Sequence, residues 1–201
     1  MTRTCVFPMT AYGQLVHACH AQAGIETGGA LVGWHVDGRF IIPFVLRAGP
    51  RAKGTAVSFE PDCAAQQPIL DFLFARFGAD YVGDFHSHPV TYPLPSSRDW
   101  STAIEIVTSQ DWNTPHAVFP IAVVKGSRVH VRAFALSCGQ DDFREIPIEI
   151  VPDHHPLIVE FLISKPKEVR NNGADTAHRR RGSSAGGSLV RRVAARLRVR
   201  A

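Results

Sequence analysis

Two histidines separated by one residue place the strongest constraint on how this chain can fold. His86 and His88 end an apolar segment, and side chains two residues apart on a strand point to the same face. Three prolines within residues 89–95 predict a loop that turns the chain back. Apolar residues at helical spacing then predict a helix over residues 97–109, with Asp99 in its first turn. The pattern therefore predicts a strand, a loop and a helix that bring both imidazoles close to one carboxylate.

The composition is that of a globular protein. The chain has 201 residues, of which 45% are hydrophobic and 20% charged, enough for one domain with its own core. No apolar run approaches the roughly 20 residues of a membrane-spanning helix, and the first ten residues lack the pattern of a secretory signal. We therefore expect a cytoplasmic protein without a transmembrane segment. The four cysteines form no CxxC pair and are expected to be reduced thiols, several of them buried.

Charge divides the chain into two parts. Residues 165–201 hold 11 Lys and Arg against 2 acidic residues, a formal charge of +9, whereas residues 1–164 hold 11 against 16, a charge of −5. The apolar residues of segment 188–200 share one helical face among five arginines, which is typical of a basic amphipathic helix. We expect one folded domain over residues 1–164 and a basic, mostly disordered tail over residues 165–201. Such a tail is suited to contact an acidic partner or nucleic acid.

Local signals predict an α+β domain. Helices are indicated where apolar residues recur at helical spacing, and strands where short apolar runs end at turn residues. Pro43 predicts a bulge or an edge position in its strand, and Pro68 a kink or break in its helix. The predicted helices cover residues 9–23, 60–77 and 97–109. The predicted strands cover residues 28–34, 39–47, 55–59, 80–88, 117–124, 128–136 and 143–151, and a short apolar segment follows at 157–163.

The side chains of His86, His88 and Asp99 suit a zinc site. Imidazole and carboxylate are common zinc ligands, with Zn–N near ~2.0 Å, and three protein ligands leave a fourth tetrahedral position for water. Such an open position marks a catalytic rather than a structural site. Hydrolysis also needs a carboxylate that is not a ligand, acting as general base and then general acid, and Glu26 is the candidate. Ser96 is a candidate donor to the oxyanion of the tetrahedral intermediate, a contribution of roughly 3 kcal/mol.

These residues resemble the signature of the JAB/MPN (JAMM) zinc metallopeptidase family, most closely its prokaryotic JAB-domain branch. The H-[ST]-H-x7-S-x2-D pattern is matched at every fixed position, by His86, Ser87, His88, Ser96 and Asp99. The stretch 26–33, ETGGALVG, is similar to the strand entry that bears the family's glutamate. The resemblance implies an α+β, JAB/MPN-like (cytidine-deaminase-like) fold, which is a curved mixed β-sheet flanked by helices. It also implies one Zn²⁺ per chain.

The resemblance further implies an activity and partners. Members of this family cleave peptide or isopeptide bonds at the C-terminus of a ubiquitin-like protein or its conjugates, and the prokaryotic branch is often associated with E1-like and E2-like proteins. Two features depart from the better-known deubiquitinating members. Segments 49–58 and 110–115 are short, and Asp84 stands two residues before His86, where an aromatic residue is often found. Because Asp84 shares the face of the histidines, it is a candidate to orient an imidazole.

Simpler interpretations of the same residues stay open. The two histidines suit a half-buried strand, Ser96 and Asp99 form the [ST]-x-x-[DE] pattern of a helix capping box, and Glu26 suits a solvated turn. Glu60 and Glu105 are competing general bases, although Glu60 is expected in the first turn of a helix and Glu105 off the apolar stripe of its helix. At the level of function, a non-catalytic scaffold of the same fold is the main alternative. A nucleic-acid-associated protein that acts through its basic tail is another.

Overall fold

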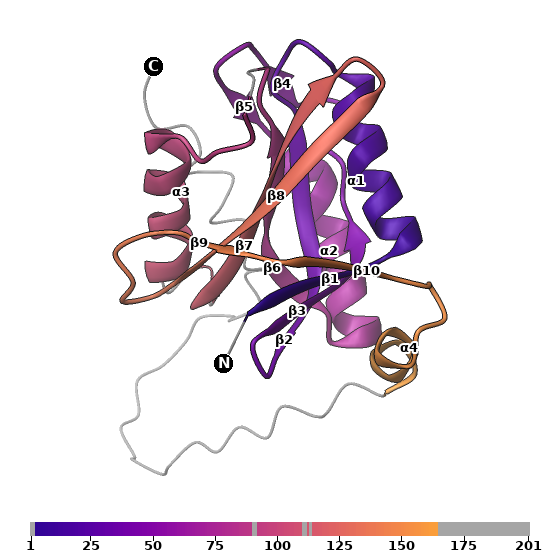
Figure 1. The fold of residues 1–201 in the computed structure, drawn as a ribbon. Helices are drawn as coiled ribbons and strands as arrows, with labels where there is room; N and C mark the ends of the chain where they lie inside the picture. The colour runs from indigo at the N-terminus through magenta and orange to yellow at the C-terminus, as the bar shows by residue number, and fades with distance from the viewer. Residues whose placement is uncertain (1–2, 90–91, 110–111, 113, 165–201) are drawn as a thin grey trace, which may run out of the picture.

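A computed structural model describes residues 3–89, 92–109, 112 and 114–164 (Figure 1). In this part of the chain the helices are α1 (Met9–Ala21), α2 (Cys63–Phe77), α3 (Ser97–Thr108) and α4 (Pro156–Ile163). The strands are β1 (Thr4–Pro8), β2 (Gly28–Val36), β3 (Arg39–Val45), β4 (Lys53–Gly54), β5 (Phe59–Glu60), β6 (Asp80–Ser87), β7 (His116–Lys125), β8 (Arg128–Ser137), β9 (Arg144–Ile146) and β10 (Ile148–Val151). Most lie where the sequence predicts them, but β1 was not anticipated.

The main sheet is mixed and strongly curved. Its strand order in the described residues is β10-β1-β3-β2-β6-β7-β8-β9. β1 pairs parallel with β3 and β10, β6 pairs parallel with β7, and the other neighbours are antiparallel. The edge strands β9 and β10 are separated only by Pro147, so the sheet curves far enough for one continuous segment to pair with both of its edges. The prediction of a single strand over 143–151 is therefore wrong, because proline has no N–H to continue the ladder.

Helices cover both faces of this sheet (Figure 1). On one face, α1 buries Leu15 and Cys19 against Phe7, Phe40 and Phe85. On the other face, α2 and α3 bury a second cluster against β2, β6 and β7, and α4 packs near them over β1 and β3. The alternation of side chains along β6 divides its residues between the two clusters. The residues at the end of β6 that face α3 therefore form the candidate site.

Strand β2 requires glycine where it lies between β3 and β6. A Cβ added at Gly29 would lie 1.8 Å from the carbonyl oxygen of Leu46, and one at Gly33 would lie 1.9 Å from that of Ile41. The pairing of β2 with β3 shifts between Val32 and Trp34, next to Pro43. This shift confirms the bulge that the proline predicts.

The segment before α2 differs from the prediction. Residues 55–58 form the turn between β4 and β5, closed by the Thr55 N–H donating to the Ser58 carbonyl at 2.8 Å, so the predicted strand over 55–59 is wrong. Glu60 lies on β5 rather than in a helix. The helix begins at Cys63, because the Asp62 carboxylate caps it by accepting the Ala65 N–H. It continues through Pro68 without a break to Phe77.

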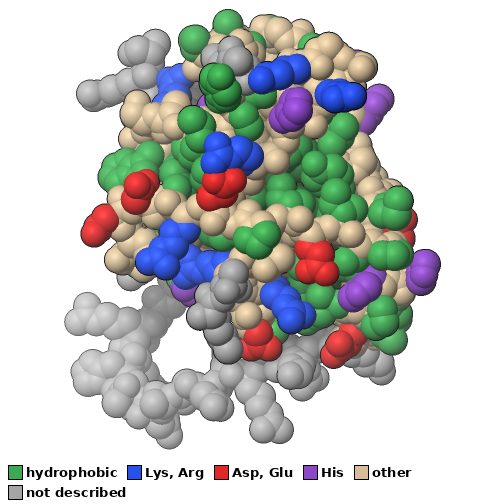
Figure 2. Space-filling model, in the orientation of Figure 1, with side chains coloured by type: hydrophobic (Ala, Val, Ile, Leu, Met, Phe, Trp, Pro, Cys, Tyr) green, Lys and Arg blue, Asp and Glu red, His purple; other side chains and the backbone are tan. Residues whose placement is uncertain are grey.

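Several expectations concern the whole chain. Cys5, Cys19 and Cys63 are buried, Cys138 is exposed, and all four are free thiols, as predicted. Among the described residues, none of the helices has the length and apolar character needed to cross a membrane. The face drawn in Figure 2 mixes acidic, basic and apolar side chains. The predicted basic tail, with its helix over 188–200, lies outside the described residues.

Candidate metal centre

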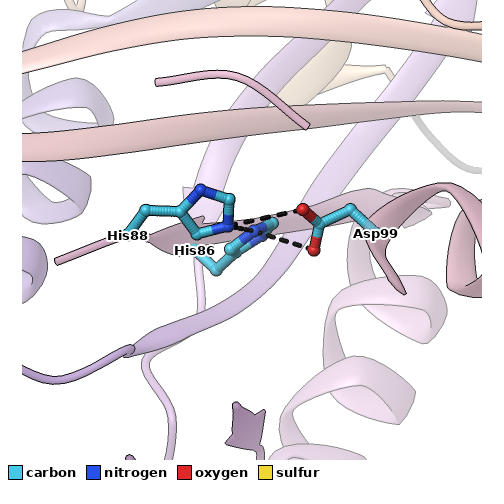
Figure 3. Close-up of side chains that lie close together, drawn as sticks. All are labelled: His86, His88 and Asp99. Atoms are coloured by element: carbon cyan, nitrogen blue, oxygen red, sulfur yellow. Dashed lines mark hydrogen bonds and ion pairs between the residues drawn. The ribbon is translucent and has the colours of Figure 1, made fainter. Parts of the chain in front are cut away.

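Three candidate ligands converge where β6 ends (Figure 3). His86 lies near the end of β6, and His88 follows directly, with its N–H donating to the Ala122 carbonyl of β7 at 2.8 Å. Asp99, in the first turn of α3, faces both rings. Its Oδ1 lies 3.1 Å from His86 Nε2, and its Oδ2 lies 3.3 Å from His88 Nε2. The structure thus brings together three side chains that the sequence places in two different elements.

The spacing of these atoms suits one small cation. The two Nε2 atoms are 2.8 Å apart, and the ligand atoms of all three residues lie within 4.8 Å of one another. Ligand atoms around a tetrahedral zinc ion lie roughly 3.3 Å apart when each bond is near ~2.0 Å. Imidazole nitrogens this close to each other and to a carboxylate are all satisfied by a shared cation, because each then donates a lone pair. The donor set therefore fits zinc.

The capping box of α3 fixes the position of Asp99. Ser96 Oγ accepts the Asp99 N–H at 3.2 Å, and Asp99 Oδ2 accepts the Ser96 N–H at 2.6 Å. This confirms the capping-box interpretation of the pair. Burial raises the pKa of Asp99, but hydrogen bonds from the two imidazoles outweigh it and hold that pKa well below its usual range. Asp99 is thus an ionised carboxylate held in place by its own helix terminus.

Glu26 lies beside the two imidazoles just before β2. Its Oε1 is 3.9 Å from His88 Nε2, too far for a direct hydrogen bond. Burial raises the pKa of Glu26, and the nearby His88 and His86 partly offset this effect. The Ser87 N–H donates to the Thr27 carbonyl at 2.7 Å, and the Thr27 N–H donates to Ser87 Oγ at 3.2 Å. The residue between the two histidines therefore anchors the segment that carries Glu26.

The β4–β5 hairpin connects Glu26 with α3, a feature that the sequence does not reveal. The Glu26 N–H donates to the Thr55 carbonyl at 2.7 Å. A Cβ at Gly54 would lie 2.2 Å from the Glu26 carbonyl oxygen, so the two backbones are in close contact. At the tip of the hairpin, the Val57 carbonyl accepts a hydrogen bond from Arg98 Nη1 at 3.3 Å. The x-x positions of the motif are unconstrained, so nothing in the pattern marks Arg98.

The other acidic candidates lie elsewhere. Glu60 and Glu105 are exposed on β5 and α3. Asp84 Oδ2 accepts the Tyr81 hydroxyl at 2.7 Å, not an imidazole N–H, and burial raises the pKa of Asp84 to about 6. Tyr81 and Asp84 share one face of β6 because its pairing with β2 skips Val82, a bulge that reverses the alternation.

Comparison with known proteins agrees with this description. A family model described as prokaryotic homologs of the JAB domain matches residues 8–137. A relative from Enterobacter hormaechei subsp. hoffmannii (strain UCI 50), named CD-NTase/cGAS isopeptidase, is 25% identical over 151 residues, covering 73% of this chain and 80% of the relative. A solution structure of a protein from Desulfitobacterium hafniense has a TM-score of 0.59 at 18% identity, covering 75% of this chain and 97% of that one.

The curved mixed sheet with its helices defines the class as a JAB/MPN-like α+β protein, and the fold prediction is confirmed. The family match covers more than half of the chain and every candidate site residue. The chain belongs to the prokaryotic JAB-domain family, whose members are JAMM-type metallopeptidases.

Proposed function

We propose that this protein is a zinc-dependent peptidase or isopeptidase that cleaves at the C-terminus of a ubiquitin-like protein or of its conjugates. The observation that carries the proposal is the convergence of His86, His88 and Asp99, with Glu26 beside them as an additional carboxylate. His86, His88 and Asp99 would hold one zinc ion per chain. A bound zinc ion supplies Lewis-acid chemistry, which polarises a carbonyl and lowers the pKa of water to ~7.

Glu26 transfers the proton during hydrolysis, and Ser96 stabilises the negative charge of the oxyanion. Glu26 takes a proton from the attacking water while the oxygen of that water bonds to the scissile carbonyl carbon. Glu26 then passes the proton to the leaving amine as the C–N bond breaks. Its raised pKa suits the first step, because a carboxylate with a higher pKa is a stronger base. Among the described residues, the Ser96 hydroxyl accepts a hydrogen bond from the Asp99 N–H and donates none. Its own proton is therefore available to the oxyanion.

The substrate class is supported by the family and by the name of the relative. That relative is named as an isopeptidase for CD-NTase/cGAS, and a CD-NTase conjugate is accordingly one substrate to test here. Exposed apolar side chains border the site: Val57 at the tip of the hairpin is 75% exposed, and Leu94, just before Ser96, is 48% exposed. Such side chains offer contacts to an extended peptide. E1-like and E2-like proteins are the expected partners that form the conjugate.

The test is hydrolysis by the purified full chain loaded with zinc. The substrates are a ubiquitin-like protein and a CD-NTase, each joined to a lysine by an isopeptide bond, with products identified by mass spectrometry. We expect cleavage at the isopeptide bond, and Glu26→Gln should keep its zinc but lose activity by roughly 10²-fold or more. The exposed Glu105→Gln is the matched control and should keep full activity. An active Glu26→Gln variant would reject the role of Glu26, and a zinc-loaded wild-type protein that cleaves neither conjugate would reject the proposed substrate class.

A further inference from the structure

A cavity of about 390 Å³ lies beside Ser96, between α3 and the connection from β8 to β9. Aromatic side chains form much of its lining: Trp100, Phe134 and Phe143. Trp100 is 38% exposed, and its Nε1 donates to the Asp141 carbonyl at 3.3 Å. The Phe143 ring packs edge-on against Phe134 with 6.1 Å between centroids. The aromatic wall is thus held in place and still accessible to a ligand.

The rim of this cavity is acidic. Asp142 and Glu145 line it, and no Lys or Arg is among its lining residues in the described part of the chain. Glu145 is occupied, because it accepts two hydrogen bonds from Arg132. Asp142 accepts only the N–H of its neighbour Phe143 among the described residues, at 2.7 Å. On the left of the face in Figure 2, near α3 and the β8–β9 connection of Figure 1, acidic, basic and apolar side chains lie close together.

The same region already binds one guanidinium in this way. The Arg132 guanidinium carbon lies 5.4 Å from the centroid of the Phe134 ring while its nitrogens bond Glu145. An aromatic face together with a carboxylate is the environment that favours a guanidinium or ammonium group. Trp100 and Asp142 present the same two chemical features toward the cavity, and no cationic side chain of the described residues occupies them. The cavity therefore suits a second cationic side chain.

The cavity also lies on a defined side of the candidate metal centre. Ser96 lines it and caps the helix that bears Asp99. In the strand order, β6 carries His86 and leads directly into His88. The hairpin contacts the segment leading into β2 on one side, and the cavity adjoins β8 and β9 on the other. A peptide that crosses the site therefore meets the hairpin on one flank of the scissile bond and the cavity on the other.

We propose that this cavity is a substrate subsite that selects an arginine or lysine side chain near the scissile bond. This inference rests on the proposed function and adds the substrate preference of that same site. Burial of the side chain against Trp100, with Asp142 as its counter-ion, distinguishes a cationic residue from a neutral one of the same shape.

The test compares peptides that differ only in charge. Arginine and its uncharged isostere citrulline are placed in turn at each position on both flanks of the cleaved bond, and kcat/KM is measured with the zinc-loaded full chain. At one position we expect arginine to exceed citrulline by about tenfold, equivalent to roughly 1.4 kcal/mol. Asp142→Asn should reduce this ratio toward one. Glu105→Gln, on the exposed side of α3, should leave it unchanged.

The outcomes separate the subsite from the activity. Equal kcat/KM for the two peptides at every position would overturn the subsite and leave the proposed function intact. If no peptide is cleaved, that result counts against the proposed function. The subsite is then tested by measuring how tightly the same peptides bind to the Glu26→Gln variant. Equal Kd values for arginine and citrulline peptides in that assay would overturn it. Loss of the arginine preference on adding a synthetic peptide of residues 188–200 would assign the cavity to the tail and would also overturn it.

Discussion

At the scale of single residues, Ser96 has two uses that can be separated. Its oxygen caps α3 by accepting the Asp99 N–H, and its proton is the proposed donor to the oxyanion. A cap contributes to stability, whereas an oxyanion donor acts only on the rate. Glycine is a tolerable N-cap without a hydroxyl, so it removes one use and largely keeps the other.

Ser96→Gly should therefore lose rate far more than stability. We expect kcat to fall by roughly 10²-fold or more, while the free energy of unfolding falls by only a few tenths of a kcal/mol, about what glycine costs at an N-cap. Ser96→Thr retains both the oxygen and the proton and serves as the control. Steady-state kinetics and urea unfolding of the same preparations provide the two readouts. A glycine variant that turns over at the wild-type rate would leave Ser96 only its capping role.

The sequence could predict which residues meet at the site, but not all of their supports. Strand alternation, a proline-rich loop and a helix start are local features, and they bring together His86, His88 and Asp99. The support of Glu26 depends instead on the pairing of Thr27 with Ser87, 60 residues away. The contact of Tyr81 with Asp84 depends on a bulge that only the partner strand defines. Neither feature leaves a local signal.

At the scale of elements, the β4–β5 hairpin holds the general-base candidate against the ligand-bearing helix. Its Thr55 carbonyl accepts the Glu26 N–H, and its Val57 carbonyl accepts the Arg98 guanidinium. Among the described residues, the Arg98 side chain hydrogen-bonds the Val57 carbonyl and no candidate metal ligand, so it is a positioning residue that acts through the hairpin. Loss of its hydrogen bond leaves the hairpin tip attached at one side only.

Arg98→Ala should lower kcat by about tenfold, because small displacements of a catalytic group are costly, and it should leave the zinc content unchanged. Arg98→Lys should recover much of the loss, because an ammonium group also donates to a carbonyl oxygen. The exposed Arg128→Ala is the matched control. Separate measurement of kcat and KM distinguishes positioning from substrate binding. A rise in KM with unchanged kcat would contradict a positioning role.

The predicted elements differ from the observed ones where pairing is non-local. Helices and central strands have enough apolar periodicity to be recognised, and α2, β7 and β8 lie close to their predicted ranges. β1 pairs with β10, more than 140 residues away in the chain, and its five residues alone give too short a pattern. The division of segment 143–151 follows from Pro147 lying where the segment passes from one sheet edge to the other.

At the scale of the whole molecule, stability should depend on an imidazole pair across the sheet. His35 on β2 and His116 on β7 have ring centroids 4.8 Å apart. Burial is the main cause that lowers the pKa of each imidazole. The positive charge of Arg3 lowers the pKa of both further, and His116 also lowers that of His35. Because the pKa of each histidine is lower in the folded state than in the unfolded state, folding favours the neutral imidazole. The stabilisation is present above the ordinary histidine pKa of about 6.5 and is lost as the pH falls below it.

The His35→Phe variant should therefore lose less stability than the wild type between pH 7.5 and pH 5. His35 Nε2 has no hydrogen-bond partner among the described residues, and phenylalanine can keep the stacking on Phe40. Urea unfolding of both proteins at the two pH values gives the comparison, and the metal centre contributes equally to each. Identical losses in the two proteins would contradict the inferred role of the pair.

The proposed function depends most on one metal ion held jointly by His86, His88 and Asp99. The most direct measurement is the zinc content per chain, determined by elemental analysis after gel filtration of zinc-supplied protein. We predict about one zinc ion in the wild type and in the exposed-histidine control His130→Gln, as expected for a three-ligand catalytic site. We predict almost none in His86→Gln or His88→Gln. A wild-type protein without bound zinc, or ligand variants that keep a full equivalent, would contradict it.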